Sequence, residues 1–304
     1  MRKPIRIGTR DSELALFQAN LVANKLQALG CQTTMVPIKS AGDLILDKPL
    51  YEFGITGIFT KTLDAALLAN KIDLAVHSMK DVPTALPHGL LQTAVLERES
   101  AADVLVTPYE VDHVDALTIA TGSLRRKAQW LHRYPHHKTV DLRGNMQTRL
   151  NKLVENGWHG GIFAAAGLSR INLLPDKFHE LNWMIPAPAQ GAIVLVAREN
   201  DFTTREVSAF LNHSESEKCT HIERQFLRTL EGGCTAPIGA NAKIVKDEIF
   251  FEGALFSLDG TDKIHMQKST TLIHYSNFGA ECAREIIALG GDLILEKIKN
   301  AQGN

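Results

Sequence analysis

Hydrophobic and polar positions alternate between strand-like and helix-like periods over the first hundred residues. Short apolar runs at 5–7 and 35–38 predict strands, and the apolar positions of 14–29 recur with the period of a helix. A second helix is predicted over 60–70, followed by a buried strand over 72–77. Strands that alternate with helices in this way predict βαβ units and a parallel sheet.

The same pattern restarts near residue 104. Strands are predicted over 117–121, 139–142 and 162–166, and a helix follows each of the first two. The Pro- and Ala-rich segment 185–191 predicts a crossing linker, and the apolar run 192–197 after it fits into a sheet as a buried strand. We therefore expect a second α/β domain, with the chain returning to the first.

The remainder of the chain has a different pattern. Residues 242–266 alternate as antiparallel strands do, with a turn at Asp259-Gly260, and a helix is predicted over 278–289. These features indicate a small C-terminal α+β domain.

Composition and charge narrow the function classes. At 304 residues with 44% hydrophobic residues, the chain can bury a sizeable core and exceeds one typical domain in length. A net charge of -1 argues against a general nucleic-acid binder. The start of the chain lacks the apolar run of a signal peptide, and no stretch reaches the length of a membrane span. We expect a cytoplasmic protein that binds neither nucleic acid nor membrane.

Cys234 stands apart from the other three cysteines. It follows two glycines and precedes Pro237, so we expect its thiol on a turn. Cys31 opens a strand-like run, Cys219 precedes a helical pattern and Cys282 lies inside an amphipathic stretch, which is typical of core thiols. Four cysteines without a secretion signal favour reduced thiols in the cytosol.

Polar clusters fall where predicted strands end and helices begin, the edge at which open α/β sheets bind ligands. Ser12 stands at the first such position, and Ser123 at a later one. Helix N-termini favour anions, and planar guanidinium groups suit carboxylates or phosphates. The arginines at these positions, which predict a ligand with several negative groups, are Arg10, Arg125, Arg126, Arg143 and Arg149. For any one of them, a solvated surface position or a structural ion pair is the alternative.

Two titratable residues lie at the end of the strand predicted over 72–77 or just after it. Asp81, after Lys80, could balance a developing cation or move protons, or it could be a turn aspartate before Pro83. His77 could be catalytic or a hydrogen-bonded structural histidine. No metal-ligand spacing, Walker P-loop or G-x-G-x-x-G sequence occurs, so no metal or nucleotide is expected.

Taken together, the motifs resemble the porphobilinogen deaminase (hydroxymethylbilane synthase) family over essentially the whole chain. The resemblance rests on motifs in the family's order and spacing: Ile7-Gly8-Thr9-Arg10, residues 39–43, His77-Ser78-Met79-Lys80-Asp81-Val82-Pro83, Ser123-Leu124-Arg125-Arg126, Leu142-Arg143-Gly144-Asn145 with Arg149, Ala166-Gly167-Leu168, and Leu230-Glu231-Gly232-Gly233-Cys234 with Pro237-Ile238-Gly239.

The resemblance implies a three-domain fold. Two periplasmic-binding-protein-like α/β domains would be hinged over a cleft, and a small C-terminal α+β domain with a three-stranded antiparallel sheet would carry the cofactor cysteine. The implied boundaries are 1–98 with 192–210 for domain 1, 99–191 for domain 2 and 211–304 for domain 3.

It also implies the chemistry. A dipyrromethane cofactor would be joined to Cys234 by a thioether, and four porphobilinogen molecules would be condensed onto it with loss of ammonia before hydrolysis releases hydroxymethylbilane. Asp81 would stabilise the cationic azafulvene and move protons. The residues implied to contact the cofactor are Lys80, Asp81, Ser123, Arg125, Arg126, Arg143 and Gly144, and those implied to bind substrate are Arg10, Ser12, Arg149, Arg170 and Gln190.

The sequence departs from the family pattern in a few places. Glu52, Ile55 and Thr56 lie in a segment that commonly carries lysine and glycine, and Ala189 stands where a glycine often precedes the Gln-Gly pair. The primary expectation is an active, monomeric transferase. The alternatives are an anion-binding solute-binding or sensor protein of the same fold, which needs neither Cys234 nor Asp81, and a degenerate relative that elongates poorly.

Overall fold

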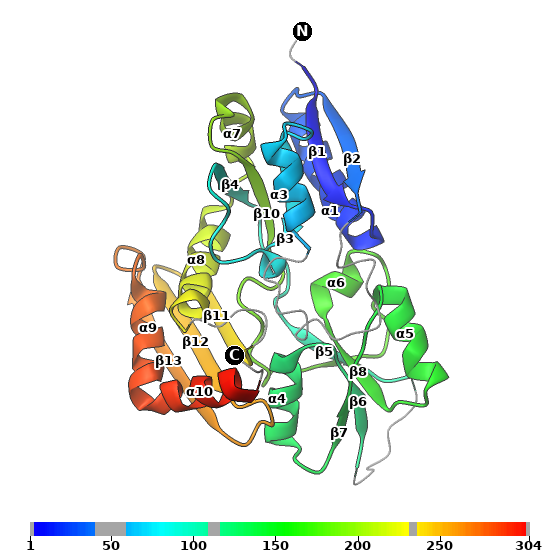
Figure 1. Ribbon diagram of the computed structural model, residues 1–304, viewed down its shortest axis with the longest axis vertical. Coiled ribbons are helices and arrows are strands. Elements are labelled where there is room, and N and C mark those ends of the chain that lie inside the picture. The colour runs from blue at the N-terminus through cyan, green and yellow to red at the C-terminus, as the bar shows by residue number, and fades with distance from the viewer. Residues whose placement is uncertain (1–2, 40–58, 109–115, 231–235, 302–304) are drawn as a thin grey trace. The chain divides into compact units, whose positions relative to one another are not determined.

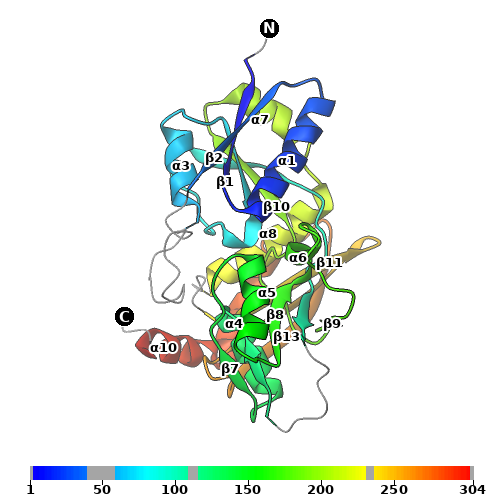
Figure 2. The same ribbon diagram turned by 90° about the vertical axis from the view of Figure 1, so that its right-hand side faces the viewer.

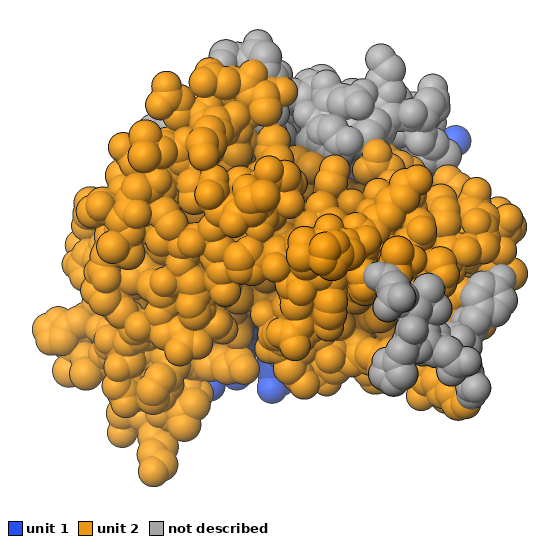
Figure 3. Space-filling view, turned by 90° about the horizontal axis from the view of Figure 1, so that it is seen from below, with its two compact units in different colours: residues 1–46, 55–99, 191–218 blue, residues 47–54, 100–190, 219–304 orange. Residues whose placement is uncertain are grey.

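The structure is a computed structural model that describes residues 3–39, 59–108, 116–230 and 236–301 (Figure 1). The chain divides into two compact units, coloured separately in Figure 3. Unit 1 holds the described residues up to Glu99 together with Gly191–Lys218, and unit 2 holds those from Ser100 to Gln190 and from Cys219 onward. The three domain boundaries expected from the sequence stay a prediction.

Unit 1 is built on a five-stranded sheet of order β2-β1-β3-β10-β4. Strand β1 pairs in parallel with β2 and β3, whereas β10 is antiparallel to both β3 and β4. The elements are β1 (Ile5–Arg10), α1 (Glu13–Ala28), β2 (Thr33–Ile38), α3 (Lys61–Leu68), β3 (Leu74–Ser78), the 3-10 turn η2 (Met79–Asp81), β4 (Leu90–Val95), β10 (Ile193–Arg198) and α7 (Phe202–Ala209).

Helices α1 and α3 cover opposite faces of this sheet (Figure 2). Alternate residues of a strand point to opposite faces, so Leu74 and Val76 pack with α1 while Ala75, between them, packs with α3. This two-sided burial explains the continuous apolar run that β3 shows in the sequence.

Unit 2 contains a second five-stranded sheet of order β7-β6-β8-β5-β9. Strand β6 pairs in parallel with β7 and β8, and β5 is antiparallel to β8. The elements are β5 (Asp103–Val106), β6 (Thr118–Ala120), α4 (Leu124–Arg133), β7 (Lys138–Val140), α5 (Met146–Glu155), β8 (Gly160–Ala164), α6 (Ala165–Ser169) and β9 (His179–Glu180).

The two sheets share one plan. In each, a first strand lies between two parallel neighbours, and an antiparallel strand follows beside the third. That antiparallel strand is β10 in unit 1 and β5 in unit 2, and each comes directly after the chain has crossed from the other unit. The return of the chain through β10, predicted from the apolar run 192–197, is confirmed, as is the α/β class of both five-stranded sheets.

The C-terminal part of unit 2 is a three-stranded antiparallel sheet of order β11-β12-β13, which confirms the predicted architecture. Its core includes Phe226, Phe251 and Cys282. On the other face, Phe256 packs with Ala128 of α4 and Ile185. The elements are α8 (Ser214–Thr229), β11 (Ile238–Val245), β12 (Glu248–Phe256), β13 (Lys263–Thr271), α9 (Phe278–Ile286), the π-helical turn η3 (Ile287–Gly291) and α10 (Asp292–Ala301).

Two local predictions were wrong. Ala165 and Ala166, expected at the end of a strand, begin helix α6, because alanine has the highest helix propensity and the sheet pairing of β8 stops at Ala164. Cys219, expected before a helix, lies inside α8, which begins at Ser214 with Glu215 and Glu217 in its first turn, where acidic side chains favour a helix start.

Candidate functional site

The predicted site residues of unit 1 lie where β1 and β3 end. These strands are parallel neighbours, so their carboxyl ends share one edge of the sheet. Arg10 is the last residue of β1, and its Cζ lies 4.3 Å from the centroid of the Phe59 ring. Ser12 occupies the N-cap position of α1, although its side chain makes no capping hydrogen bond. Arg10 is therefore held at the edge by an aromatic face.

His77 lies inside β3, beside the end of β1, and is only 6% exposed. Burial, and then the charge of Arg10, lower the pKa of His77 to about 4. Its Nε2 atom makes no hydrogen bond within the described part of the chain. A histidine in this state is neutral near pH 7. Both interpretations of His77, catalytic and structural, stay predictions.

Lys80 and Asp81 follow on the 3-10 turn η2. Met79, the first residue of the turn, is buried, and its backbone N–H donates to the Ala192 carbonyl of β10 at 3.0 Å. Ser78 and Gln18 of α1 are joined by a side-chain hydrogen bond of 2.8 Å. These contacts position the turn, and they leave Lys80 and Asp81 half-buried at the same edge as Arg10.

In unit 2, Ser123 caps helix α4 directly after β6. Its hydroxyl accepts from the Arg126 backbone N–H at 3.5 Å. The turn before it runs close to the end of β7, since a Cβ added at Gly122 would lie 2.6 Å from the Leu142 carbonyl oxygen. Glycine is required here by close backbone approach.

Arg125 and Arg126 are both buried, and both pair with Asp103 at the start of β5. Arg125 Nη1 lies 2.7 Å from Asp103 Oδ2, and Arg126 Nη2 lies 2.8 Å from Asp103 Oδ1. Gln190 Nε2 donates to the same carboxylate at 2.8 Å and to the Ala101 carbonyl at 2.7 Å. The structural ion pair, which was the alternative for any single arginine, is thus what these two residues make.

Electrostatics of this cluster favour an anion nearby. Burial alone would raise the pKa of Asp103, but the charges of Arg125 and Arg126 outweigh it and hold that pKa well below its usual range. Two guanidinium groups and one carboxylate leave one uncompensated positive charge in the cluster. The Nε donor of Arg125 is buried and has no hydrogen-bond partner among the described residues. Positive charge in a buried setting is weakly screened, so it attracts anions strongly.

Arg143, Gly144 and Arg149 lie around the N-terminus of α5. Asn145 caps this helix by accepting from the Thr148 N–H at 2.8 Å. Arg149 Nε donates to the Gly144 carbonyl at 2.7 Å. Burial lowers the pKa of Arg143, with the nearby Asp141 opposing the shift. The predicted placement of these residues at a strand-to-helix turn is confirmed.

The remaining predicted site residues lie outside these clusters or outside the described part of the chain. Arg170 is 7% exposed at the C-cap of α6. Cys234, Glu52, Ile55 and Thr56 lie outside the described residues. No three ligand-type side chains gather as a metal site in the described ranges.

Sequence reasoning missed two buried carboxylates of unit 2. One is Asp103. The other is Glu223 of α8, which is fully buried and accepts from the N–H groups of Ala189 at 2.6 Å and Ala242 at 2.7 Å. An acidic residue at the start of an apolar strand, as in Asp103-Val104-Leu105-Val106, is a usable signal, because a buried charge needs partners.

The fold and these edges define a class of protein: an α/β ligand-binding fold whose strand-to-helix edges carry arginines suited to an anionic ligand. Residues 5–206 match the family model described as porphobilinogen deaminase, dipyromethane cofactor binding domain, and residues 217–288 match the model of the porphobilinogen deaminase C-terminal domain. The chain belongs to the porphobilinogen deaminase family.

Individual relatives agree over nearly the full length. The porphobilinogen deaminase of Chloroherpeton thalassium is 39% identical, with 98% of this chain and 99% of that protein covered. That of Moorella thermoacetica is 41% identical, with 98% of each covered. Among solved structures, the VFT2 domain of Bordetella pertussis BvgS is 16% identical with a TM-score of 0.41, covering 68% of this chain and 84% of that domain.

Family membership confirms the enzyme class and the cofactor predicted from the sequence. The chain is a transferase of tetrapyrrole biosynthesis, and its larger matched region is the dipyrromethane-binding domain of the family. No helix in the described ranges is both long and apolar enough to cross a membrane.

Proposed function

We propose that this chain is a hydroxymethylbilane synthase in which Asp81 is the catalytic carboxylate and Cys234 anchors the cofactor. The observation that carries the proposal is the buried cluster of Asp103, Arg125 and Arg126, whose uncompensated positive charge stands at the capped N-terminus of α4. Porphobilinogen carries an acetate and a propionate group, so its polymer needs such an environment.

The residues present fit a dipyrromethane. Its carboxylates require guanidinium and ammonium donors, and the buried Nε of Arg125 is a donor that no described residue satisfies. We assign cofactor contacts to Cys234, Lys80, Asp81, Ser123, Arg125, Arg126, Arg143 and Gly144. When bound, the dipyrromethane supplies the free pyrrole carbon to which the first substrate unit is joined.

Arginines outside the buried cluster are assigned to substrate recognition. Arg10 and Arg149 each have a fixed orientation, one over the Phe59 ring and one hydrogen-bonded to the Gly144 carbonyl. A guanidinium group held in place loses less conformational entropy when it binds a carboxylate. Ser12, Arg170 and Gln190 complete the proposed substrate set; the donors of Gln190 already hold Asp103 and Ala101, so we expect it to act by positioning them.

Asp81 is assigned the chemical step. Loss of ammonia from the aminomethyl group leaves positive charge spread over the substrate's pyrrole ring. A carboxylate next to the pyrrole N–H stabilises that charge and can then accept the proton released on condensation. The turn η2, anchored by Met79, gives Asp81 the fixed position that such stabilisation needs.

Two other functions make different predictions. A solute-binding or sensor protein would bind the anion without consuming it, and a degenerate relative would carry the cofactor but elongate poorly. The family match over nearly the whole chain favours the enzyme over the first. A cytoplasmic location and a monomeric state complete the proposal; four cysteines spread over 304 residues suit reduced thiols better than a disulfide framework, which supports the location.

Kinetics of Asp81→Asn and Asp81→Glu test the assignment. We expect Asp81→Asn to lower kcat by at least about 100-fold, in the range of a lost catalytic charge, while KM changes little. Asp81→Glu retains a carboxylate and should recover part of the loss. Intact mass identifies cofactor loading in each variant, so failure to load is distinguishable from failure to turn over. Near-normal kcat in loaded Asp81→Asn would remove Asp81 from the chemical step.

A further inference from the structure

A groove of about 400 Å³ lies in unit 2, and none of the residues assigned above lines it. It is formed by the C-terminal half of α4, by Trp183 and Ile185, and by the face of the three-stranded sheet that carries Phe256. Its lining residues are Gln129, His132, Arg133, Trp183, Ile185, Glu252, Phe256, Lys263 and His265. The volume is within the range of pockets that hold small organic molecules.

The floor of the groove is closed by two buried apolar side chains. The side-chain amide of Gln129, beside them, is hydrogen-bonded through both its nitrogen and its oxygen. Ile185 and Phe256 are buried, with 4% and 2% of their surface exposed. Gln129 Nε2 donates to the Ile185 carbonyl at 2.9 Å, and Gln129 Oε1 accepts from the Ile185 N–H at 2.8 Å. The floor therefore asks for no hydrogen bond from a ligand, and the accessible ring surface of the groove lies on Trp183, His132 and His265.

Four ring-bearing side chains line this one groove: Trp183, Phe256, His132 and His265. The ring of His132 meets that of Phe256 edge-on, with centroids 5.5 Å apart, and His132 Nδ1 lies 2.8 Å from the Gly260 carbonyl. Rings arranged in this way favour a flat aromatic ligand through stacked and edge-on contacts.

Two exposed cations stand at the rim, each held over a ring. Arg133 Cζ lies 4.9 Å from the Trp183 centroid, and Lys263 Nζ lies 5.6 Å from the Phe256 centroid. Both cations are therefore kept at the groove, and no carboxylate among the described residues draws either of them away from it. They are the groups that an anionic substituent on the ligand would meet.

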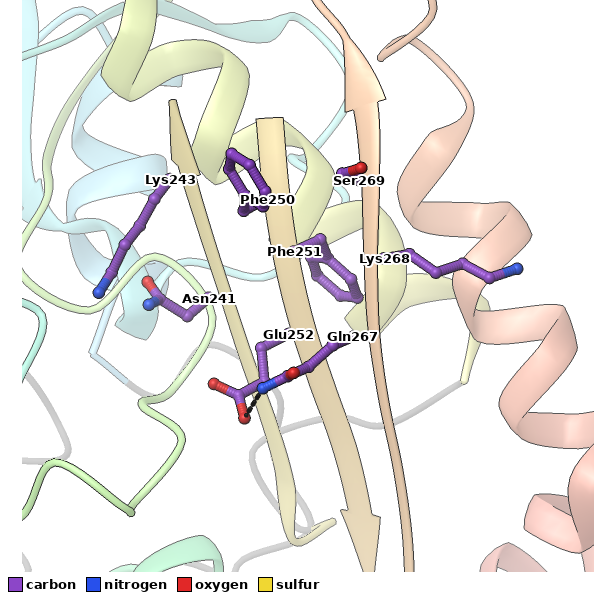
Figure 4. A pocket seen from close by; sticks show the side chains of 8 residues that line it. All are labelled: Asn241, Lys243, Phe250, Phe251, Glu252, Gln267, Lys268 and Ser269. Carbon is purple, nitrogen blue, oxygen red and sulfur yellow. Dashed lines mark hydrogen bonds between the residues drawn. The ribbon is translucent and has the colours of Figure 1, made fainter. Parts of the chain in front are cut away.

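Glu252 is the one acidic residue in the lining. Its Oε1 accepts from His265 Nε2 at 2.8 Å and from Gln267 Nε2 at 3.1 Å, the second of which is drawn in Figure 4. Apart from the histidines, Arg133 and Lys263 against Glu252 leave one net positive charge in the lining. The charge balance favours a ligand with a single negative group.

We propose that this groove binds a planar aromatic carboxylate, with its ring against the accessible rings of Trp183 and His132 and the carboxylate between Arg133 and Lys263. A second hollow on the same sheet face, of about 430 Å³, shows the contrast (Figure 4). Its only rings are Phe250 and Phe251, and its Lys268 already pairs with Glu285. The proposal does not depend on the function proposed for the sheet edges.

The test uses the cofactor-loaded protein labelled with 5-fluorotryptophan, which gives three fluorine resonances because the chain has three tryptophans. Trp183→Phe assigns the resonance of the groove. The probe is naphthalene-2-carboxylate, and naphthalene-2-carboxamide is its uncharged analogue. We expect a saturable shift of the Trp183 resonance with the carboxylate and binding weaker by on the order of tenfold with the carboxamide, the loss typical of a charge-assisted contact.

The variants that complete the test change rim residues only. The floor is left intact because the Ile185 carbonyl also accepts a hydrogen bond from Arg125 Nη1. Arg133→Gln with Lys263→Gln should weaken probe binding on the order of tenfold or more. The matched control, Lys138→Gln with Lys243→Gln, removes the same charge elsewhere in unit 2 and should leave the affinity unchanged. Arg149→Gln should also leave it unchanged, which separates the groove from the proposed substrate site.

Three results would overturn the proposal. They are an unshifted Trp183 resonance up to the solubility limit of the probe, equal affinity for carboxylate and carboxamide, and equal affinity in the rim variant and its matched control.

Discussion

The two five-stranded sheets have the same strand plan but place their ion pairs at opposite edges. In unit 1, Asp73 pairs with Arg6 at 2.7 Å and with Arg198 at 2.9 Å, at the edge where β1 and β3 begin. In unit 2, Asp103 pairs with Arg125 and Arg126 at the edge where β6 and β8 end, which is the proposed ligand edge.

This difference shows two ways to build a ligand edge on one fold. Unit 2 buries charge at the edge and so provides a fixed positive field. Unit 1 keeps its buried group there neutral, as His77, and presents Arg10, Lys80 and Asp81 around it. A fixed positive field suits the binding of carboxylates, whereas a neutral His77 adds no charge to the surroundings of Asp81.

Asp103→Asn, in unit 2, should have the largest effect on stability. It leaves two buried guanidinium groups with no carboxylate, and we expect the free energy of unfolding to fall by about 3–5 kcal/mol. Asp73→Asn is the matched control. Its network is partly exposed, with 15% of the Asp73 side chain accessible, so we expect about 1–2 kcal/mol there.

Urea denaturation of both variants measures these losses. Equal losses, or a loss below about 1 kcal/mol for Asp103→Asn, would mean that the carboxylate of the buried cluster contributes no more stability than that of the partly exposed network.

His77 should make the stability of unit 1 depend on pH. Its folded pKa of about 4 lies below the unfolded value of about 6.5, so the unfolded chain binds more protons between these limits. The stability that His77 contributes is therefore present above pH 6.5 and is lost as the pH falls to 4, by about 3 kcal/mol. Proton NMR of the His77 imidazole measures the folded pKa directly.

Asp103, whose folded pKa is depressed, also loses stability toward acid, so a variant must isolate the histidine. His77→Gln should show a smaller loss of stability between pH 7 and pH 4 than the unaltered chain, by the amount His77 contributes. Identical pH profiles, or a His77 pKa near 6.5, would contradict the neutral buried state.

Ala189→Gly should have the smallest effect, at the junction beside Gln190. Ala189 has a φ of 62°, in the left-handed region that costs a non-glycine residue about 1 kcal/mol. Glycine relieves this strain but gains entropy in the unfolded chain, so we expect a net stabilisation of about 0.5 kcal/mol. Ala187→Gly, on the same segment without a positive φ, should destabilise instead. Thermal denaturation of the pair distinguishes the two signs, and destabilisation by both would argue against strain at Ala189.

Much of the fold was predictable because it depends on local patterns. The helical period ending at Gly30 matches α1, and the apolar run of 192–197 matches β10. The placement of Ser123, Arg143 and Arg149 at strand-to-helix turns followed from the same periodicity.

The partners of those residues were not predictable, because they are distant in the chain. Asp103 reaches Arg125 and Arg126 only because β5 lies antiparallel to β8, and Gln190 joins them from the end of the crossing linker. Glu223, on α8, likewise accepts hydrogen bonds from the backbone N–H groups of Ala189 and Ala242, which are distant in the chain. A periodic pattern reports which side of an element is buried, but it does not report which buried charges meet.

The central claim is that this chain is a transferase that carries a dipyrromethane on Cys234, and the intact mass of the purified protein tests it most directly. The account predicts a mass above that of the sequence by two linked pyrrole units, and no such increment in a Cys234→Ser variant prepared in parallel. An unmodified mass that stays unchanged after incubation with porphobilinogen would contradict it.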